Sequence, residues 1–200
     1  AMRALFALNP PSMDLLHPFI THDMVSTEKE KEEIGHKLYA WTKAALDLWM
    51  SSTDYHATKI RFLEDAMKCA VNSPTKSDWF GTRQTSYLIV ETDGSYDLQD
   101  HLKVAGSASA EIRALGKHVS EASIEDAGII AEERIISLGA DKTPAACHGC
   151  DWEQSCSGGF LPTRYSSEKL FDNPSVYCGG LMLLLADLRE LLINANKVNV

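Results

Sequence analysis

The sequence predicts an α+β fold: N-terminal helices, one small β-hairpin, and a cysteine-rich metal-binding lobe closed by a C-terminal helix. Three observations support it. Apolar residues recur at helical spacing in two N-terminal segments, a β-branched and aromatic run precedes an Asp-Gly turn, and four of the five cysteines lie in the last third of the chain. The 200 residues suffice for one domain with a core, with or without a short appendage.

The first long helix is expected to begin at Ser26 or Thr27. Glu30 stands three residues after Thr27, as in a capping box. The charged run over 28–33 then forms a solvated face. One buried face and an end near 51–52 follow from the apolar positions Ile34, Leu38, Trp41, Ala45 and Leu48. The tryptophans expected in the core are Trp41, Trp49 and Trp79.

A second helix is expected over about 55–71, where Asn72-Ser73-Pro74 ends it. Its buried side would carry Ile60, Leu63, Met67 and Ala70.

The period then changes to that of strands. Residues 87–91 form one strand, Asp93-Gly94 predicts a two-residue type I′ turn, and residues 95–98 return. Residues 107–138 are expected to form short helical segments broken near 116, 120 and 128. A closing helix is expected over 180–195.

Four cysteines carry the chemistry, in the spacing Cys147-x2-Cys150-x5-Cys156-x21-Cys178. Thiolates are soft ligands that select zinc or iron–sulfur centres over magnesium or calcium. The segment 139–178 is long for a structureless loop, and a metal centre would hold it together. Spacing alone leaves zinc and a cluster open, although C-x2-C-x5-C is less usual for zinc; disulfides or idle thiols are the remaining alternative. The fifth cysteine, Cys69, is expected to be a small core residue.

Composition excludes several classes. A net charge of −9 and a pI near 5.2 disfavour a broad nucleic-acid surface. No apolar run approaches the roughly 18 residues of a membrane helix. No secretory signal is visible, and the clustering of four cysteines in an acidic chain indicates a reducing, cytoplasmic location.

A family resemblance rests on longer stretches. The segment CHGCDWEQSCSGGFLPTRYSSEKLFDNPSVYC resembles the cluster-binding segment of radical SAM enzymes with a SPASM-type extension. It is most similar to the branch that modifies ribosomally made peptides (RiPP maturation), and is related to the anaerobic sulfatase-maturing enzymes. The stretch YLIVETDGSYDLQDHLKVA resembles the hairpin that opens this extension. Two more, MDLLHPFITHD and YAWTKAALDLWM, resemble the segment after the radical SAM barrel.

The resemblance implies two regions: residues 1–82, a helical segment following a barrel missing from this chain, and residues 83–200, a SPASM-like domain. It implies that Cys147, Cys150, Cys156 and Cys178 bind an auxiliary 4Fe–4S cluster. A second auxiliary cluster is expected to be absent, because Phe160 and Gln99 stand where that cluster's cysteines would be.

The catalytic C-x3-C-x2-C motif occurs nowhere in this sequence. S-adenosylmethionine is therefore expected only in the missing barrel domain, in cis or in trans, and no radical activity is expected from this chain by itself. The chain would be an excised portion, a split subunit or a degenerate relative.

The expected function is that of an auxiliary-cluster and peptide-substrate-binding domain of a radical SAM maturase. Its partners would be the barrel domain and a precursor peptide or protein, which the hairpin edge could bind as an added strand. The alternative is a structural Zn²⁺ domain that mediates protein contacts. A stand-alone electron carrier is disfavoured, because ferredoxin cysteine runs are denser.

Several other residues have two readings each. Asp100 aligns with a proton-accepting aspartate of the sulfatase-maturing relatives, or is a solvated residue ending the hairpin. Arg164 donates hydrogen bonds toward the cluster, or lies on the surface. Tyr165, Phe171 and Tyr177 are expected to pack as a dry shell around the cluster. A polar loop is expected at His17 and His22-Asp23, and His148 is not expected to be a ligand.

Overall fold

A computed structural model describes residues 1–51, 53–75, 77–81 and 87–198, and within them the α+β prediction is confirmed. The helices are α1 (Met2–Phe6), α2 (Glu28–Met50), α3 (Thr53–His56), α4 (Arg61–Ala70), α5 (Ser109–Arg113), α6 (Ile124–Ser137), α7 (Glu153–Cys156) and α8 (Cys178–Val198). The 3-10 helices are η1 (His22–Met24), η2 (Asp100–Ala108), η3 (Ala145–Cys147) and η4 (Leu161–Arg164). The strands are β1 (Ser12–Met13), β2 (Lys59–Ile60), β3 (Leu88–Val90), β4 (Ser95–Leu98) and β5 (Ala114–His118).

The predicted cap of α2 is confirmed. The Glu30 N–H donates to Thr27 Oγ1 at 3.1 Å, and the Glu30 carboxylate accepts from the Ser26 N–H at 2.8 Å. Trp49 is buried as expected, but Trp41 is 49% exposed, so its predicted core position is wrong. The buried line of α2 runs instead through Gly35, Leu38, Thr42, Ala45, Leu46 and Trp49.

The single helix predicted over 55–71 is wrong at its beginning. The chain forms α3, then the short strand β2, and only then α4. Strand β2 pairs in parallel with β1, and the N–H of Lys59 donates to the carbonyl of Pro11 at 3.2 Å. This partner lies far away in the sequence, so local periodicity could not indicate it. Of the four residues predicted on its buried side, Leu63 and Ala70 are fully buried in α4, Met67 is partly buried, and Ile60 is buried but lies in β2.

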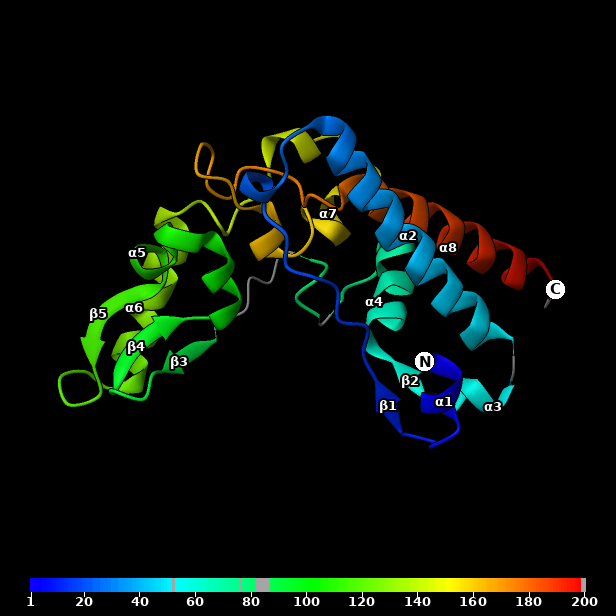
Figure 1. Cartoon of the computed structure of the whole chain (residues 1–200), viewed down its shortest axis with the longest axis horizontal. Coiled ribbons are helices and arrows are strands. Elements are labelled where there is room, and N and C mark those ends of the chain that lie inside the picture. The colour runs from blue at the N-terminus through cyan, green and yellow to red at the C-terminus, as the bar shows by residue number, and fades with distance from the viewer. Residues whose placement is uncertain (52, 76, 82–86, 199–200) are drawn as a thin grey trace.

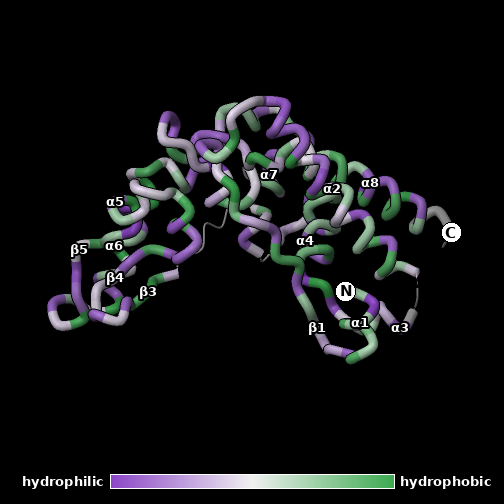
Figure 2. Tube along the Cα trace, viewed as in Figure 1, coloured by the Kyte–Doolittle hydropathy of each residue, from purple (hydrophilic) through white to green (hydrophobic). Residues whose placement is uncertain are grey.

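Helices α2, α4 and α8 pack together at one end of the molecule (Figure 1). Figure 2 shows a hydrophilic start of α2 and a largely hydrophobic α8. Two glycines allow α2 and α8 to approach, because a Cβ added at Gly180 would lie 1.9 Å from the carbonyl oxygen of Gly35. The apolar side of α8, including Leu181, Leu184 and Leu188, is buried in this core.

The other end of the molecule holds a three-stranded antiparallel sheet in the order β3-β4-β5 (Figure 1). The hairpin is confirmed, but its type I′ turn is wrong. The Glu91 N–H donates to Ser95 O, so the loop has three residues, and Gly94 (φ 89°) takes the positive φ. Strand β5 replaces one of the short helices expected in 107–138, and α6 continues through Gly128.

The cysteine-bearing segment lies between these two ends (Figure 1). Trp152, Val176 and Tyr177 belong to the helical core, whereas Leu161 and Phe171 belong to the core beneath the sheet. The predicted boundary between residues 82 and 83 lies outside the described residues. None of the described helices is both long enough and apolar enough to cross a membrane.

Candidate metal centre

All four predicted cysteines line one pocket. Cys147 ends η3, Cys150 follows it, Cys156 ends α7 and Cys178 begins α8. The rest of the wall is mainly apolar and comes from Trp152, Gly158, Leu181, Met182 and Leu185, with Glu153 at its polar side. Among the residues that the structure describes, no three His, Cys, Asp or Glu side chains converge tightly enough to hold a single ion.

The C-x2-C pair is a type II turn. The Cys150 N–H donates to Cys147 O at 3.1 Å, His148 has φ −63° and ψ 128°, and Gly149 has φ 80°. This turn requires a positive φ at its third residue, which glycine adopts without strain. Glu153 holds the turn from outside, accepting the Gly149 N–H at 2.9 Å and contacting His148 Nδ1 at 2.8 Å. His148 is thus hydrogen-bonded to Glu153.

Cys156 sits at a tight reversal in which Ser157, Gly158 and Gly159 all have positive φ. The Gly159 N–H donates to the Cys156 carbonyl oxygen at 3.0 Å, and the backbone N–H groups of Gly158 and Gly159 act to lower the pKa of Cys156. The pKa of Cys156 is nevertheless raised well above the usual value, first by a hydrogen bond with the Cys69 thiol and then by burial. Cys69 is buried in α4 as predicted, but sequence reasoning missed this contact, which joins residues on separate elements.

The pKa values of Cys147 and Cys178 are raised as well. Burial raises the pKa of Cys147 to about 11, and the neighbouring charges of Cys178, Cys156 and Cys150 add to it. Burial likewise raises the pKa of Cys178 to about 11, with further contributions from Cys156 and Cys150. Thiols in such a group bind a proton tightly without a cation and lose it to a bound metal. The donor set fits a metal centre.

A network of hydroxyl and backbone bonds positions Cys178 relative to the other three. Ser175 N–H donates to Gly158 O at 2.8 Å, and Cys178 N–H donates to Ser175 O at 2.9 Å. Thr163 Oγ1 donates to Ser175 Oγ at 2.7 Å. The long segment 139–178 is therefore ordered by its own short helices and hydrogen bonds.

Arg164 is 1% exposed, so the alternative of a surface arginine is wrong. Its Nε and Nη2 donate to Phe171 O, at 3.1 and 2.7 Å, and Nη2 also donates to Lys142 O. Tyr165 and Phe171 are buried and pack with ring centroids 5.6 Å apart. Tyr177 is buried too, but none of the three rings lines the cysteine pocket, so their role as a dry shell around a cluster stays a prediction.

Two contacts join the N-terminal segment to the cysteine-bearing segment. His22 contacts Pro174 O through Nε2 at 2.8 Å, and the Asp23 carboxylate accepts the Ser167 N–H at 2.9 Å. The expected polar loop is wrong for His17, which is 6% exposed among Trp41, Phe62 and Trp79. Burial lowers the pKa of His17 to about 4.

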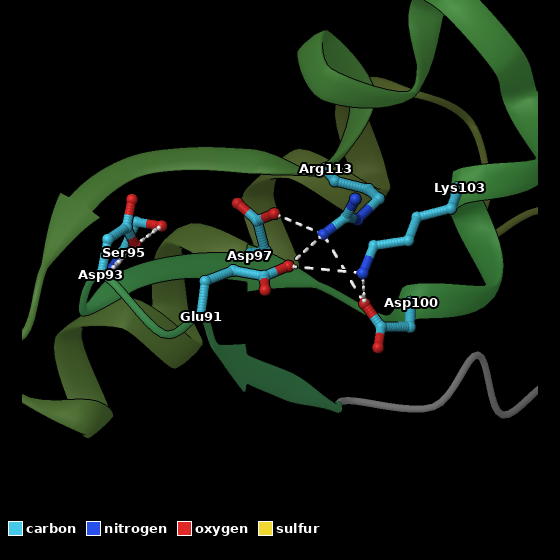
Figure 3. A network of polar contacts seen from close by, with 7 residues as sticks. All are labelled: Glu91, Asp93, Ser95, Asp97, Asp100, Lys103 and Arg113. Atoms are coloured by element: carbon cyan, nitrogen blue, oxygen red, sulfur yellow. Dashed lines mark hydrogen bonds and ion pairs between the residues drawn. The ribbon is translucent and has the colours of Figure 1, made fainter.

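Asp100 lies in the sheet end of the molecule and does not line the cysteine pocket. Figure 3 shows its carboxylate pointing toward Lys103 and Arg113, at 2.7 and 3.6 Å. Arg113 also pairs with Glu91 and Asp97. A hydrogen bond from Lys103 lowers the pKa of Asp100, so this exposed carboxylate is ionised and weakly basic.

Comparison with known proteins supports the fold. No family model matches the sequence, and no curated protein matches it significantly. The fold is similar to part of a radical SAM enzyme. The solved structure is that of native anSMEcpe with bound AdoMet, an anaerobic sulfatase-maturating enzyme, which matches with a TM-score of 0.57 and 16% sequence identity. The match covers 93% of this chain and 47% of the solved one, so this chain spans about half of that protein's length.

Proposed function

We propose that this chain is the auxiliary iron–sulfur domain of a radical SAM maturase. Its four cysteines would hold a 4Fe–4S cluster, and its surroundings would bind a peptide or protein substrate. One observation carries the proposal: thiols spread from Cys147 to Cys178 line a single pocket. The similarity in fold to part of anSMEcpe supports it.

A zinc ion and a cluster would differ in how the four sulfurs are spaced. A tetrahedral zinc ion with Zn–S bonds of about 2.3 Å would draw four sulfurs to within about 4 Å of one another. A cubane cluster would bind each thiolate to a different iron and hold the sulfurs farther apart. The apolar wall of Trp152, Leu181 and Leu185 would shield the cluster from water.

The partners follow from the same proposal. The barrel that binds S-adenosylmethionine would be supplied in cis or in trans, because this sequence has no C-x3-C-x2-C motif. A peptide could pair with β3, which stands at the edge of the sheet order β3-β4-β5. The ionised Asp100 carboxylate would face that substrate as a proton acceptor only if binding displaced Lys103.

Anaerobic reconstitution with ferrous and ferric iron in equal amounts and sulfide tests the proposal. We expect about four irons and four sulfides per chain and a brown protein that absorbs near 400 nm. A colourless protein with four free thiols, or one that retains about one zinc and takes up no iron, would contradict it.

Two variants make a matched pair. Cys178→Ser removes a pocket ligand and should abolish a stable 4Fe–4S cluster. Cys69→Ala removes a cysteine that contacts Cys156 but does not line the pocket, so iron content should stay close to that of the unmodified chain. Equal iron loss in both variants would show that Cys69 belongs to the ligand set.

A further inference from the structure

Arg164 carries a buried charge whose counter-ion is missing from its hydrogen-bond partners. It heads the largest fully buried side chains in the described part of the chain, at 1% exposure. Two of its nitrogens donate to the carbonyls of Phe171 and Lys142, which are neutral. Its third nitrogen, Nη1, is buried with no hydrogen-bond partner among the described residues. Isolated charges are costly to bury, so a native anion is expected nearby.

The guanidinium lies beside the cysteine pocket. It packs against the reversal that follows Cys156, since a Cβ at Gly158, which lines the pocket, would be 3.5 Å from Arg164 Nε.

A bound cluster would supply the missing negative charge. Four thiolates around an oxidised 4Fe–4S core carry a net charge of −2, and one-electron reduction makes it −3. We propose that Arg164 is the counter-ion of this cluster, with Nη1 donating to a cluster sulfide or to the Cys147 sulfur and the cation favouring the reduced state. This rests on the proposed function and adds a specific positioning residue to it.

Potentiometric titration of the reconstituted chain with dithionite tests this. In Arg164→Gln the ratio of reduced to oxidised cluster at a fixed potential should fall about tenfold, a shift of about 59 mV to lower potential for a one-electron couple. Arg164→Lys retains the charge and should recover most of the shift. Arg189→Gln is the matched control: Arg189 lies over Trp152 at 4.7 Å, but it is paired with Asp151, so the potential should stay close to that of the parent chain.

A measurement on the unmodified chain guards against variants that fail to fold. With ¹⁵N-labelled arginine, pulsed EPR of the reduced cluster should detect a coupled guanidinium nitrogen, and Arg189→Lys should leave this coupling in place. Absence of the coupling, or an unchanged potential in a folded Arg164→Gln cluster, would overturn the inference while leaving the proposed function intact. A parent chain that takes up no iron would overturn both.

Discussion

Gly180→Ala tests the link between helix packing and the cysteine pocket. The added Cβ would lie 1.9 Å from Gly35 O, whereas real Cβ atoms essentially never come within 3.0 Å of a heavy atom. The obstacle is backbone of α2, so α2 and α8 must separate by roughly 1 Å or more. Overpacking of this kind costs about 3 kcal/mol, a large fraction of the stability of a typical domain.

The clash also reaches the site, because Cys178 begins α8 two residues before Gly180. We expect a lower urea midpoint with an unchanged slope, and less iron retained per chain after reconstitution. Gly179→Ala is the matched control in the next-door position. A Cβ there meets nothing within 4 Å, so stability should stay the same or rise by up to about 1 kcal/mol. If both variants unfold at the same urea concentration, the close approach at Gly35 and Gly180 does not govern the packing of α8.

The remaining predictions concern the turn, the cap and the buried histidine. Gly149→Ala places alanine at φ 80°, so it should destabilise the Cys147–Cys150 turn by about 1–2 kcal/mol and lower iron occupancy. Gly128→Ala lies inside α6 with open space around it and should stabilise the chain by about 0.5–1 kcal/mol. Urea unfolding measures both changes in stability, and changes of the same sign would refute the turn assignment. Thr27→Ala removes the cap of α2 and should lower the free energy of unfolding by about 1 kcal/mol, as measured by thermal or urea unfolding. Ser26→Ala should cost little, because only the backbone N–H of Ser26 bonds to Glu30. Equal losses in the two variants would argue against the cap. Burial lowers the pKa of His17 to about 4, so as the pH falls the unfolded chain binds a proton at this residue before the folded chain does. Stability should therefore drop by on the order of 3 kcal/mol between about pH 6.5 and pH 4. A His17→Leu variant whose stability changes with pH as steeply as that of the parent chain would contradict this origin.

Local sequence was informative where one residue's neighbours along the chain decide its structure. The cap at Thr27 and the hairpin around Gly94 both follow from the chemistry of residues within a few positions. The spacing of the cysteines in the 147–178 segment likewise predicted that four thiols belong to one metal site. Errors arose where a distant partner decided the outcome. Strand β2 forms because β1 lies beside it, and β5 forms because β4 offers a free edge.

The set of four cysteines was thus readable from the sequence, because thiolate chemistry and spacing are written in the chain itself. Only the tertiary structure decided that these thiols surround one pocket and that Cys69 contacts one of them. It alone decided that Arg164 is buried with a free Nη1. The reason is physical: burial and charge proximity depend on which remote segments pack together, here α4, α7 and α8, and no local pattern encodes that arrangement.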